Sequence, residues 1–404
     1  MPFHSRRGVI LGLGVSQTLA WASSYYLPAM LAAPMAESLG VTTPTVFAAF
    51  SVALLVSALV GPYAGQAIDK WGGRPVLMVT NLIFAIGLGG LAAAHGPVSL
   101  FLAWALLGVG MGSGLYEAAF AALVRLYGKE SRNAISGITL LAGFASTVGW
   151  PLSAYMELHW GWRAACLGWA VLHLILALPL NALLPRPQQE RAAAPLRKTE
   201  SDTATQAQPG DSATVWPSVL LALVFAVTWF TSTAMAAHLP SVLMGAGATL
   251  SAAVAAGALV GPAQVAARIA EFSLLRRTHP MFSAKLASLG HPVGAAILLA
   301  LGAPAASAFV LLHGAGNGIL TIAKGTLPLA LFGAQGYGMR QGVLMVPARI
   351  AQASAPWLFG VCVSRWGAGA LWVTAALGLC SFAALAMLRV PASKLQGVGA
   401  RSAR

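Results

Sequence analysis

Ionisable side chains inside long apolar stretches of this chain are the first candidates for chemistry. Glu117, Lys324 and Arg349 each lie within such a stretch. A charge among apolar side chains and lipid costs several kcal/mol, so it persists where a function or a partner requires it. Glu117 precedes Arg125 by about eight residues, which places its carboxyl roughly 12 Å deep along a helix. We therefore predict that Glu117 carries protons, with a surface-facing carboxylate as the alternative.

Lys324 takes nearly the same place in the second half of the chain as Glu117 takes in the first half. The two side chains could form an ion pair that favours the ionised carboxylate, and their separation would let Glu117 take up a proton. Alternatively, Lys324 extends its ammonium to the membrane surface as an anchor. Arg349 must also find a partner, and it is the next candidate partner of Glu117.

His313 and Asn317 lie deeper in the same apolar stretch as Lys324. Because they are four residues apart, a helix places them on one face. We predict that they belong to the substrate or proton path, with His313 as a ligand or proton relay. A structural histidine inside the protein is the alternative.

Further polar and aromatic side chains could line a pocket for a small solute, which needs apolar walls and a few polar groups. The candidates for the substrate path are Gln17, Trp21, Tyr25 and Trp229. Aromatic rings near the ends of apolar stretches also fit an interfacial belt. Tyr26 and His238 each stand two residues before a proline, and we predict that both line an outer vestibule.

Several other kinds of site are excluded by spacing. Four alternate glycines lack the G-x-G-x-x-G spacing of a nucleotide loop and instead form overlapping G-x-x-x-G pairs, which indicate close helix packing: Gly108, Gly110, Gly112 and Gly114. The three cysteines show no disulfide or zinc-ligand spacing. We expect no metal, no cofactor and no enzymatic activity.

The elements that position these residues are apolar helices. The chain has 404 residues, of which 58% are hydrophobic and 8% charged, and a mean hydropathy of +0.75. A soluble protein carries about 25% charged residues, so the solvent of this chain is lipid. Stretches of spanning length recur, and we predict about twelve spans at residues 8–33, 44–68, 75–95, 98–122, 134–157, 163–185, 217–243, 250–272, 283–302, 304–328, 341–363 and 368–389.

The basic residues predict the orientation of these spans. Of the 24 Lys and Arg residues, nineteen fall in segments on one side and three fall within spans, while the other side holds Arg163 and Arg365. Because basic loops stay in the cytoplasm, we expect an inner-membrane protein with both termini cytoplasmic. This placement explains the net charge of +14 without nucleic acid.

The two halves of the chain echo each other. A polar segment at residues 186–214, predicted to be a cytoplasmic linker, separates a bundle of six helices at residues 1–185 from a second at residues 215–404. Ala58–Pro62 recurs as Ala258–Pro262, and Leu27-Pro28 recurs as Leu239-Pro240. These and other matches have offsets of about 200–212 residues, which indicates a parallel duplication.

The segment from Gly65 to Arg74 reads Gly-Gln-Ala-Ile-Asp-Lys-Trp-Gly-Gly-Arg. It resembles the loop 2–3 signature of the major facilitator superfamily, G-x-x-x-D-(R/K)-x-G-(R/K)-(R/K), with Gly73 in place of a basic residue. The resemblance implies an all-α membrane protein with two pseudo-symmetric six-helix bundles, in which spans 1, 4, 7 and 10 line a central cavity. It also implies a cytoplasmic gate element formed by Gly65, Asp69, Lys70, Gly72 and Arg74.

In that gate, the glycine permits close helix approach, and the acidic residue can meet the positive N-terminus of a helix in the other half. Arg268 precedes Glu271 by three residues and stands, by the repeat, beside the position of Asp69. We therefore predict that Arg268 belongs to the inner lock. The stretch from Gly316 to Gly338 is similar to a bacterial branch that includes arsenite exporters. The arginine of drug/proton antiporters in span 4 is absent, as is the acidic–arginine pair of monocarboxylate porters.

Together these features predict a monomeric secondary transporter that moves a small solute across the bacterial cytoplasmic membrane by alternating access, coupled to protons. Its expected partners are the solute, membrane lipid and protons. Arsenite or other toxic-solute efflux and monocarboxylate or organic-anion transport remain alternatives. A membrane scaffold or receptor without transport is the alternative from another class, but it would not need Glu117 and Lys324 buried.

Overall fold

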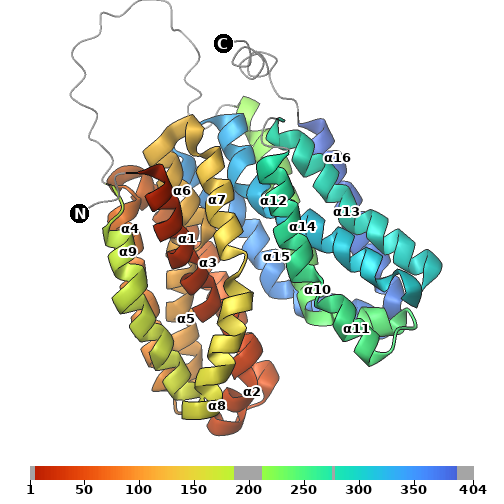
Figure 1. Ribbon diagram of the computed structural model, residues 1–404, viewed down its shortest axis with the longest axis horizontal. Helices are drawn as coiled ribbons and strands as arrows, with labels where there is room; N and C mark the ends of the chain where they lie inside the picture. The colour runs from red at the N-terminus through yellow and green to blue at the C-terminus, as the bar shows by residue number, and fades with distance from the viewer. Residues whose placement is uncertain (1–4, 186–211, 275–277, 389–404) are drawn as a thin grey trace, which may run out of the picture.

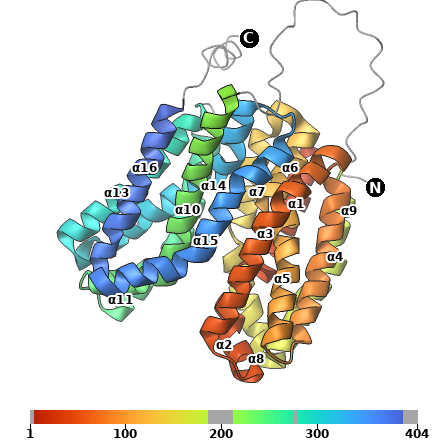
Figure 2. The same ribbon diagram turned by 180° about the vertical axis from the view of Figure 1, so that it is seen from behind.

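Helices make up all the regular secondary structure of the described residues. The computed structural model describes residues 5–185, 212–274 and 278–388. The first half contains α1 (Arg6–Ser23), α2 (Leu27–Leu39), α3 (Thr43–Trp71), α4 (Gly73–Ala92), α5 (Pro97–Gly114), α6 (Tyr116–Tyr127), α7 (Arg132–Ala142), α8 (Ala145–Leu172) and α9 (Leu178–Ala182). The second half contains α10 (Ser212–Gly245), α11 (Leu250–Gly257), α12 (Val260–Ser273), α13 (Pro280–Leu301), α14 (Ala306–Phe332), α15 (Tyr337–Trp366) and α16 (Leu371–Met387). The two halves form two bundles side by side (Figures 1 and 2).

The expected spans are present among the described residues. By length and composition, eight continuous helical stretches could cross a membrane. Pro97–Ala182 has 86 residues and contains three expected spans, and Tyr337–Met387 has 51 residues and contains two. The unit of α1 and α2 completes the set of twelve. Gly161, at a φ of 78°, divides α8 where the fifth and sixth spans were expected to separate.

Several membrane-spanning segments contain a break in the helix. At such a break, a backbone N–H or C=O group that loses its helical hydrogen bond must find another partner. Leu115 is extended between α5 and α6, with a ψ of −166°. The Gly114 carbonyl accepts a hydrogen bond from Nε2 of Gln17 at 2.6 Å. Because α6 starts directly after this break, Glu117 lies in its first turn. The break therefore puts a carboxylate at a helix N-terminus, whose dipole favours negative charge.

The two bundles meet most closely where α3 crosses α15. A Cβ on Gly65 would overlap the backbone of Gly338, and a Cβ on Gly342 would overlap the backbone of Gly61 and Pro62. Such close backbone contact requires glycine on the facing surfaces. The α3–α15 contact therefore depends on the absence of side chains.

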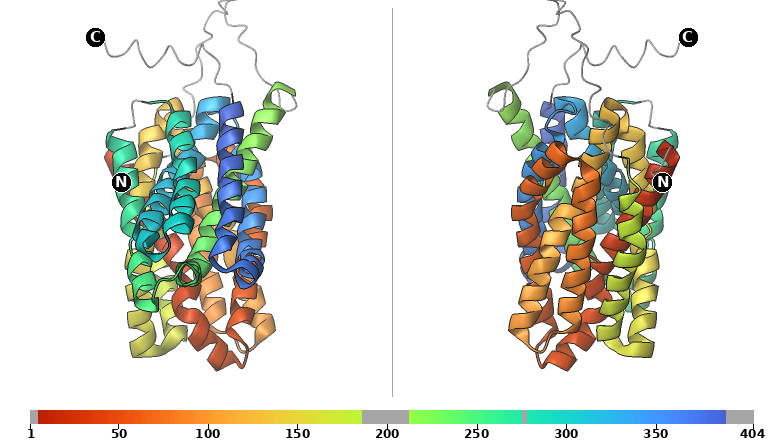
Figure 3. Two further views of the ribbon diagram at one scale, coloured as in Figure 1. Left: turned by 90° about the vertical axis from the view of Figure 1, so that its right-hand side faces the viewer. Right: turned by 90° about the vertical axis from the view of Figure 1, so that its left-hand side faces the viewer.

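The bundles converge at the end of the molecule where α9 ends and α10 begins, and they spread apart toward the end that holds α2, α8 and α11 (Figures 1 and 2). Seen from either side, the helices of both bundles run in roughly the same direction (Figure 3). Residues 186–211 of the predicted linker and the terminal segment 389–404 lie outside the described residues.

Candidate functional site: a charged aromatic cluster between the bundles

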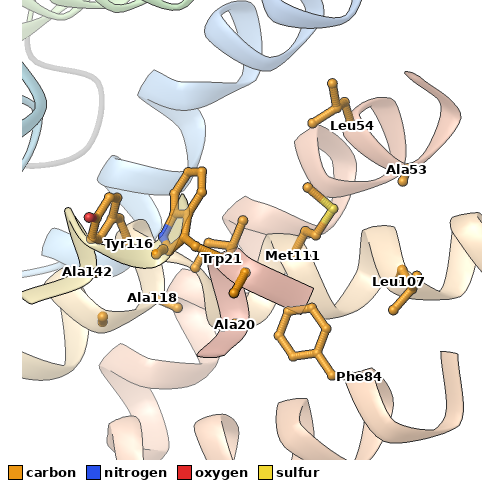
Figure 4. Close-up of a cluster of buried hydrophobic side chains, with 14 of the residues drawn as sticks. Ala20, Trp21, Ala53, Leu54, Phe84, Leu107, Met111, Tyr116, Ala118 and Ala142 are labelled. Carbon is orange, nitrogen blue, oxygen red and sulfur yellow. The ribbon is translucent and has the colours of Figure 1, made fainter. Parts of the chain in front are cut away.

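The centre of the bundle interface holds two stacked indoles. Trp21 of α1 and Trp229 of α10 have ring centroids 6.0 Å apart and an interplanar angle of 8°. Tyr116 of α6 packs against Trp21, with ring centroids 4.9 Å apart (Figure 4). The Tyr25 hydroxyl lies 3.4 Å from the Thr233 hydroxyl across the interface. The predicted wall of aromatic rings is therefore assembled from both halves.

Two cations lie over the Trp229 ring of this stack. The Lys324 Nζ is 3.7 Å from the centroid of the Trp229 ring, and the Arg349 guanidinium carbon is 5.1 Å from it. Both residues are buried, with exposures of 4% and 3%. Cation–π attraction strengthens when the charge is removed from water. Trp229 therefore provides a face that holds positive charge in the interior.

Glu117 forms an ion pair with Arg349, not with Lys324. Nη2 of Arg349 donates to Oε2 of Glu117 at 3.0 Å, and Nη1 donates to Oε1 of Gln352 at 2.9 Å. The predicted Glu117–Lys324 pair is wrong for this conformation. The reason is that α15 packs against α6 and brings Arg349 to the carboxylate, while Lys324 lies over Trp229.

The charges in this cluster do not balance. Within the described part of the chain, no carboxylate forms an ion pair with Lys324. One carboxylate, Glu117, therefore stands against the two cations Lys324 and Arg349. A cavity of about 10 Å³ lies beside Glu117 and Arg349, lined also by Ser57. That is space for about one water molecule.

Unpaired polar atoms accompany the charges. Among the buried atoms without a hydrogen-bond partner in the described residues are Oε1 of Gln17 and Nε1 of Trp21 and of Trp229. A buried polar group without a partner costs about 1–3 kcal/mol. The cluster therefore presents one acceptor and two donors that a bound molecule could satisfy.

The predicted gate element makes its contact at the α3–α15 crossing. The two carboxylate oxygens of Asp69 accept hydrogen bonds from the backbone N–H groups of Gly338 and Met339, each at 2.9 Å. The expected meeting of an acidic residue with a helix N-terminus in the other half is thus present, and it complements the dipole of α15. Its role as a gate stays a prediction.

The other predicted gate residues differ in position. Gly72, at a φ of 86°, forms the turn between α3 and α4. Lys70 is exposed and lies over the Trp71 ring at 5.4 Å, and Arg74 is half-buried. Asp69 and Gly65 therefore face the second bundle, and the Lys70 ammonium stays beside its own helix.

A second contact joins the bundles between α7 and α12. Arg132 forms an ion pair with Glu271 at 3.1 Å and also donates to the carbonyl of Thr278 at 2.7 Å. Arg268, predicted to take part in the inner lock, donates from Nη1 to the carbonyl of Thr139 at 3.1 Å. Arg132 and Glu271 were missed as site residues. The offset of 202 residues from Asp69 to Glu271 was the signal that could have found them.

His313 and Asn317 lie elsewhere. They face the interior of the second bundle, where Nδ1 of His313 lies 3.0 Å from Nδ1 of His291 and Asn317 donates to Ser232 at 3.1 Å. They are not part of the charged aromatic cluster. The sequence could not reveal this, because both faces of α14 are largely buried.

The two predicted vestibule residues are Tyr26 and His238. Tyr26 stands at the start of α2 and packs edge-on against Tyr25 and Trp150. His238 bonds through Nε2 to the Pro356 carbonyl at 2.7 Å. Both are half-buried. Their role in a vestibule stays a prediction.

Comparison with known proteins identifies the architecture. A family model described as Major Facilitator Superfamily matches residues 13–312. The proton:xylose symporter XylE bound to 6-bromo-6-deoxy-D-glucose superposes with a TM-score of 0.75 at 14% identity, over 94% of both chains. The human organic anion transporter MFSD10 (TETRAN) superposes with a TM-score of 0.70 at 16% identity, over 95% of this chain and 100% of its own. These structures share the fold.

Curated relatives match parts of the chain. An uncharacterized 38 kDa protein in the 23S RNA operon of Thermoproteus tenax is 32% identical over 182 residues, which are 44% of this chain and 47% of that protein. The multidrug resistance protein MdtH of Cronobacter sakazakii is 29% identical over 164 residues, 40% of each chain. The chain thus spans less than half the length of the curated relatives it matches.

Proposed function

The chain belongs to the Major Facilitator Superfamily of secondary transporters, and we propose that it moves a small organic anion across the bacterial cytoplasmic membrane, coupled to protons at Glu117. One observation carries the choice of an anion. Lys324 is buried between the bundles, over Trp229, with no ion-pair partner among the described residues. A buried ammonium is costly when the one carboxylate of its cluster is already paired with another cation, as Glu117 is with Arg349. An anionic substrate would supply that charge.

The polar atoms of the cluster support a substrate with a carboxylate. The indole N–H groups of Trp21 and Trp229 are buried without a hydrogen-bond partner among the described residues and can donate to a carboxylate in a pocket walled by aromatic rings. A human organic anion transporter has the same fold, so the fold is compatible with an anionic substrate.

Export is the proposed direction, because partial relatives are named multidrug resistance proteins. With both termini in the cytoplasm, as the basic residues favour, the α3–α15 and α7–α12 contacts close the cytoplasmic end. The conformation is then outward-facing. Arsenite efflux stays a prediction from the sequence.

The coupling step follows from the Glu117–Arg349 pair. Protonation of Glu117 removes the negative partner of Arg349, so that two uncompensated cations then face the substrate site. This state favours an anion and weakens the hold of α6 on α15. Since α15 also carries Gly338, at its contact with Asp69, the change can bias the equilibrium between the two conformations.

The test uses purified protein in proteoliposomes with a pH gradient. We expect uptake or release of an aromatic carboxylate to exceed that of the amide and the amine of the same skeleton. Lys324→Met should lower anion flux about tenfold or more, since hydrogen bonds to charged groups contribute about 1.5–3 kcal/mol. Glu117→Gln should lose gradient-driven flux and retain anion exchange.

The matched control is Lys285→Met, because Lys285 lies near the start of α13 and outside the cluster. It should leave anion flux within about twofold of wild type. Equal transport of the amine and the carboxylate would overturn the anion proposal. Gradient-driven flux in a folded Glu117→Gln protein would remove Glu117 from coupling.

A further inference from the structure

The second bundle encloses a polar cavity that the charged aromatic cluster does not use. Its volume is about 40 Å³, and residues of α10, α13, α14 and α16 line it, four helices that lie together in Figures 1 and 2. At 10–15 Å³ per molecule, such a volume holds about three waters. No Asp, Glu, Lys or Arg lines it.

The walls of this cavity carry hydroxyls without partners. Oγ1 of Thr231 on α10 and Oγ of Ser381 on α16 are buried, and neither has a hydrogen-bond partner in the described residues. A third wall is formed by Asn317 of α14, which donates to Ser232. A space of this size with several polar partners suits water, whereas a dry cavity is lined by apolar groups.

The histidines on its wall form a hydrogen-bonded chain that ends at the Thr374 hydroxyl. When the Thr374 hydroxyl donates to the Leu371 carbonyl at 3.1 Å, its oxygen accepts from Nε2–H of His291 at 2.8 Å. In neutral His291, Nδ1 is then an acceptor, and Nδ1–H of His313 donates to it at 3.0 Å. Neutral His313 therefore keeps an unprotonated Nε2.

We propose that this hydrated cavity is a proton-binding site, in which Nε2 of His313 takes a proton from water and His291 shares the resulting charge through the Nδ1–Nδ1 hydrogen bond. No bond other than N–H and O–H changes in this step. Two imidazoles joined nitrogen to nitrogen can share one positive charge, because the acceptor ring strengthens its hydrogen bond to the cation.

The surroundings make proton binding dependent on water. The side chains that face His313 from α10, α13 and α16 are uncharged, apart from the titratable ring of His291. The imidazolium thus has no carboxylate partner there, and it needs water and the two free hydroxyls to offset the cost of burial. Proton occupancy should therefore follow hydration of the cavity.

Position links this site to the substrate cluster. Thr228 and Thr231 of α10 line the cavity, while Trp229 between them faces Trp21. On α14, Asn317 lines the cavity and Lys324 lies two turns further on. A proton in the cavity thus acts on α10 and α14, the two helices that carry Trp229 and Lys324.

The first bundle contains a buried histidine, His173, that has no free ring nitrogen to take a proton from water. His173 accepts at Nε2 from the Ser23 hydroxyl at 2.8 Å and donates from Nδ1 to the Asn81 side-chain oxygen at 2.8 Å. Both nitrogens are used, and the stacked Phe84 covers one face of the ring at 4.8 Å. His173 is therefore the internal control.

The test is nitrogen NMR of the purified full-length protein labelled at histidine, measured from about pH 4 to 8. We expect a buried histidine pair that passes from neutral to shared cationic signals, and we expect both signals to change in His313→Gln. Thr231→Val, which keeps the shape and removes a hydroxyl, should weaken proton binding by about tenfold, or one pH unit. The same measurement on His173→Gln should leave the titration of the pair unchanged.

Each outcome decides the proposal without knowledge of the substrate. If the His291 and His313 signals stay neutral and unshifted across the range, the cavity binds no proton. An unchanged titration in Thr231→Val would also overturn the role of the hydrated wall. If His313→Gln fails to fold, the wild-type titration and the Thr231→Val shift still give the answer.

Discussion

The two contacts that close one end of the molecule take equivalent places in the predicted duplication, yet they are built differently. In the α3–α15 contact, Asp69 binds the backbone N–H groups at the start of α15, and glycines bring the two backbones together. In the α7–α12 contact, Glu271 binds the side chain of Arg132 near the start of α7. The acidic residue keeps its place in both halves, and its partner changes from main chain to side chain.

The difference indicates unequal tolerance of substitution. A contact between backbones has no side chain that can move aside, so an added methyl group must separate the helices. An ion pair between side chains can rearrange or exchange with water, and the Arg132 side chain is 21% exposed. The α3–α15 contact should therefore control closure, and the α7–α12 contact should modulate it.

The largest effect is expected from Gly65→Val. The added side chain would overlap the Gly338 backbone, and overpacking costs about 1–3 kcal/mol, which is roughly 5–150-fold in the equilibrium constant. We expect α3 and α15 to separate and transport to fall. The measurement is labelling of Met345→Cys on α15 by a membrane-impermeant thiol reagent, with Cys362 and Cys380 replaced by serine.

Gly89→Val is the matched control for that variant. Gly89 lies in α4 with nothing within 4 Å of an added Cβ, so labelling and transport should stay close to wild type. The decisive comparison is the labelling of the cysteine in Met345→Cys. If it were labelled no faster with Gly65→Val than with Gly89→Val, the glycine contact would not hold the closed state.

A smaller effect is expected from Asp69→Asn. The variant keeps one oxygen for the N–H groups of Gly338 and Met339 but loses the charge that complements the helix dipole. Turnover should fall about tenfold while the apparent substrate affinity changes little, because the substitution shifts the balance of conformations. Flux as a function of substrate concentration in proteoliposomes measures both quantities.

Glu37→Gln provides the comparison, because Glu37 is an exposed carboxylate of α2 at the open end. It should not change turnover. An Asp69→Asn protein that folds and keeps wild-type turnover would remove Asp69 from the closing mechanism.

The smallest effect is expected at the α7–α12 contact. Glu271 is buried, but Glu271→Gln keeps an oxygen that can accept from Arg132, whose side chain is 21% exposed. The loss should be about that of one hydrogen bond, roughly 1 kcal/mol, so turnover should change by no more than about fivefold. Arg132→Gln should cost more, because Arg132 also donates to the Thr278 carbonyl. The double variant should recover part of the summed loss in a double-mutant cycle.

Strictly additive losses in the cycle would mean that Arg132 and Glu271 do not act together. If the Arg132 or Glu271 variants lowered transport as much as Gly65→Val does, the α3–α15 contact would not be the more important of the two.

The sequence by itself determined the number of spans and the acidic residue that meets α15, and it predicted the duplication. Each rests on local properties: apolar length, repeated order and a short signature around Asp69. The break at Gly161 also falls between predicted spans. The breaks at Leu115 and between α1 and α2 were not predicted, because apolar composition continues through them.

Only the tertiary structure decided which side chains meet. Glu117 pairs with Arg349 because α15 packs on α6, and His313 faces its own bundle because His291 of α13 stands beside it. In a soluble helix the polar face reports the orientation. In these helices the lipid-facing and the packed faces are both apolar, so rotation about the helix axis is set by close packing with neighbours, which a single sequence does not display.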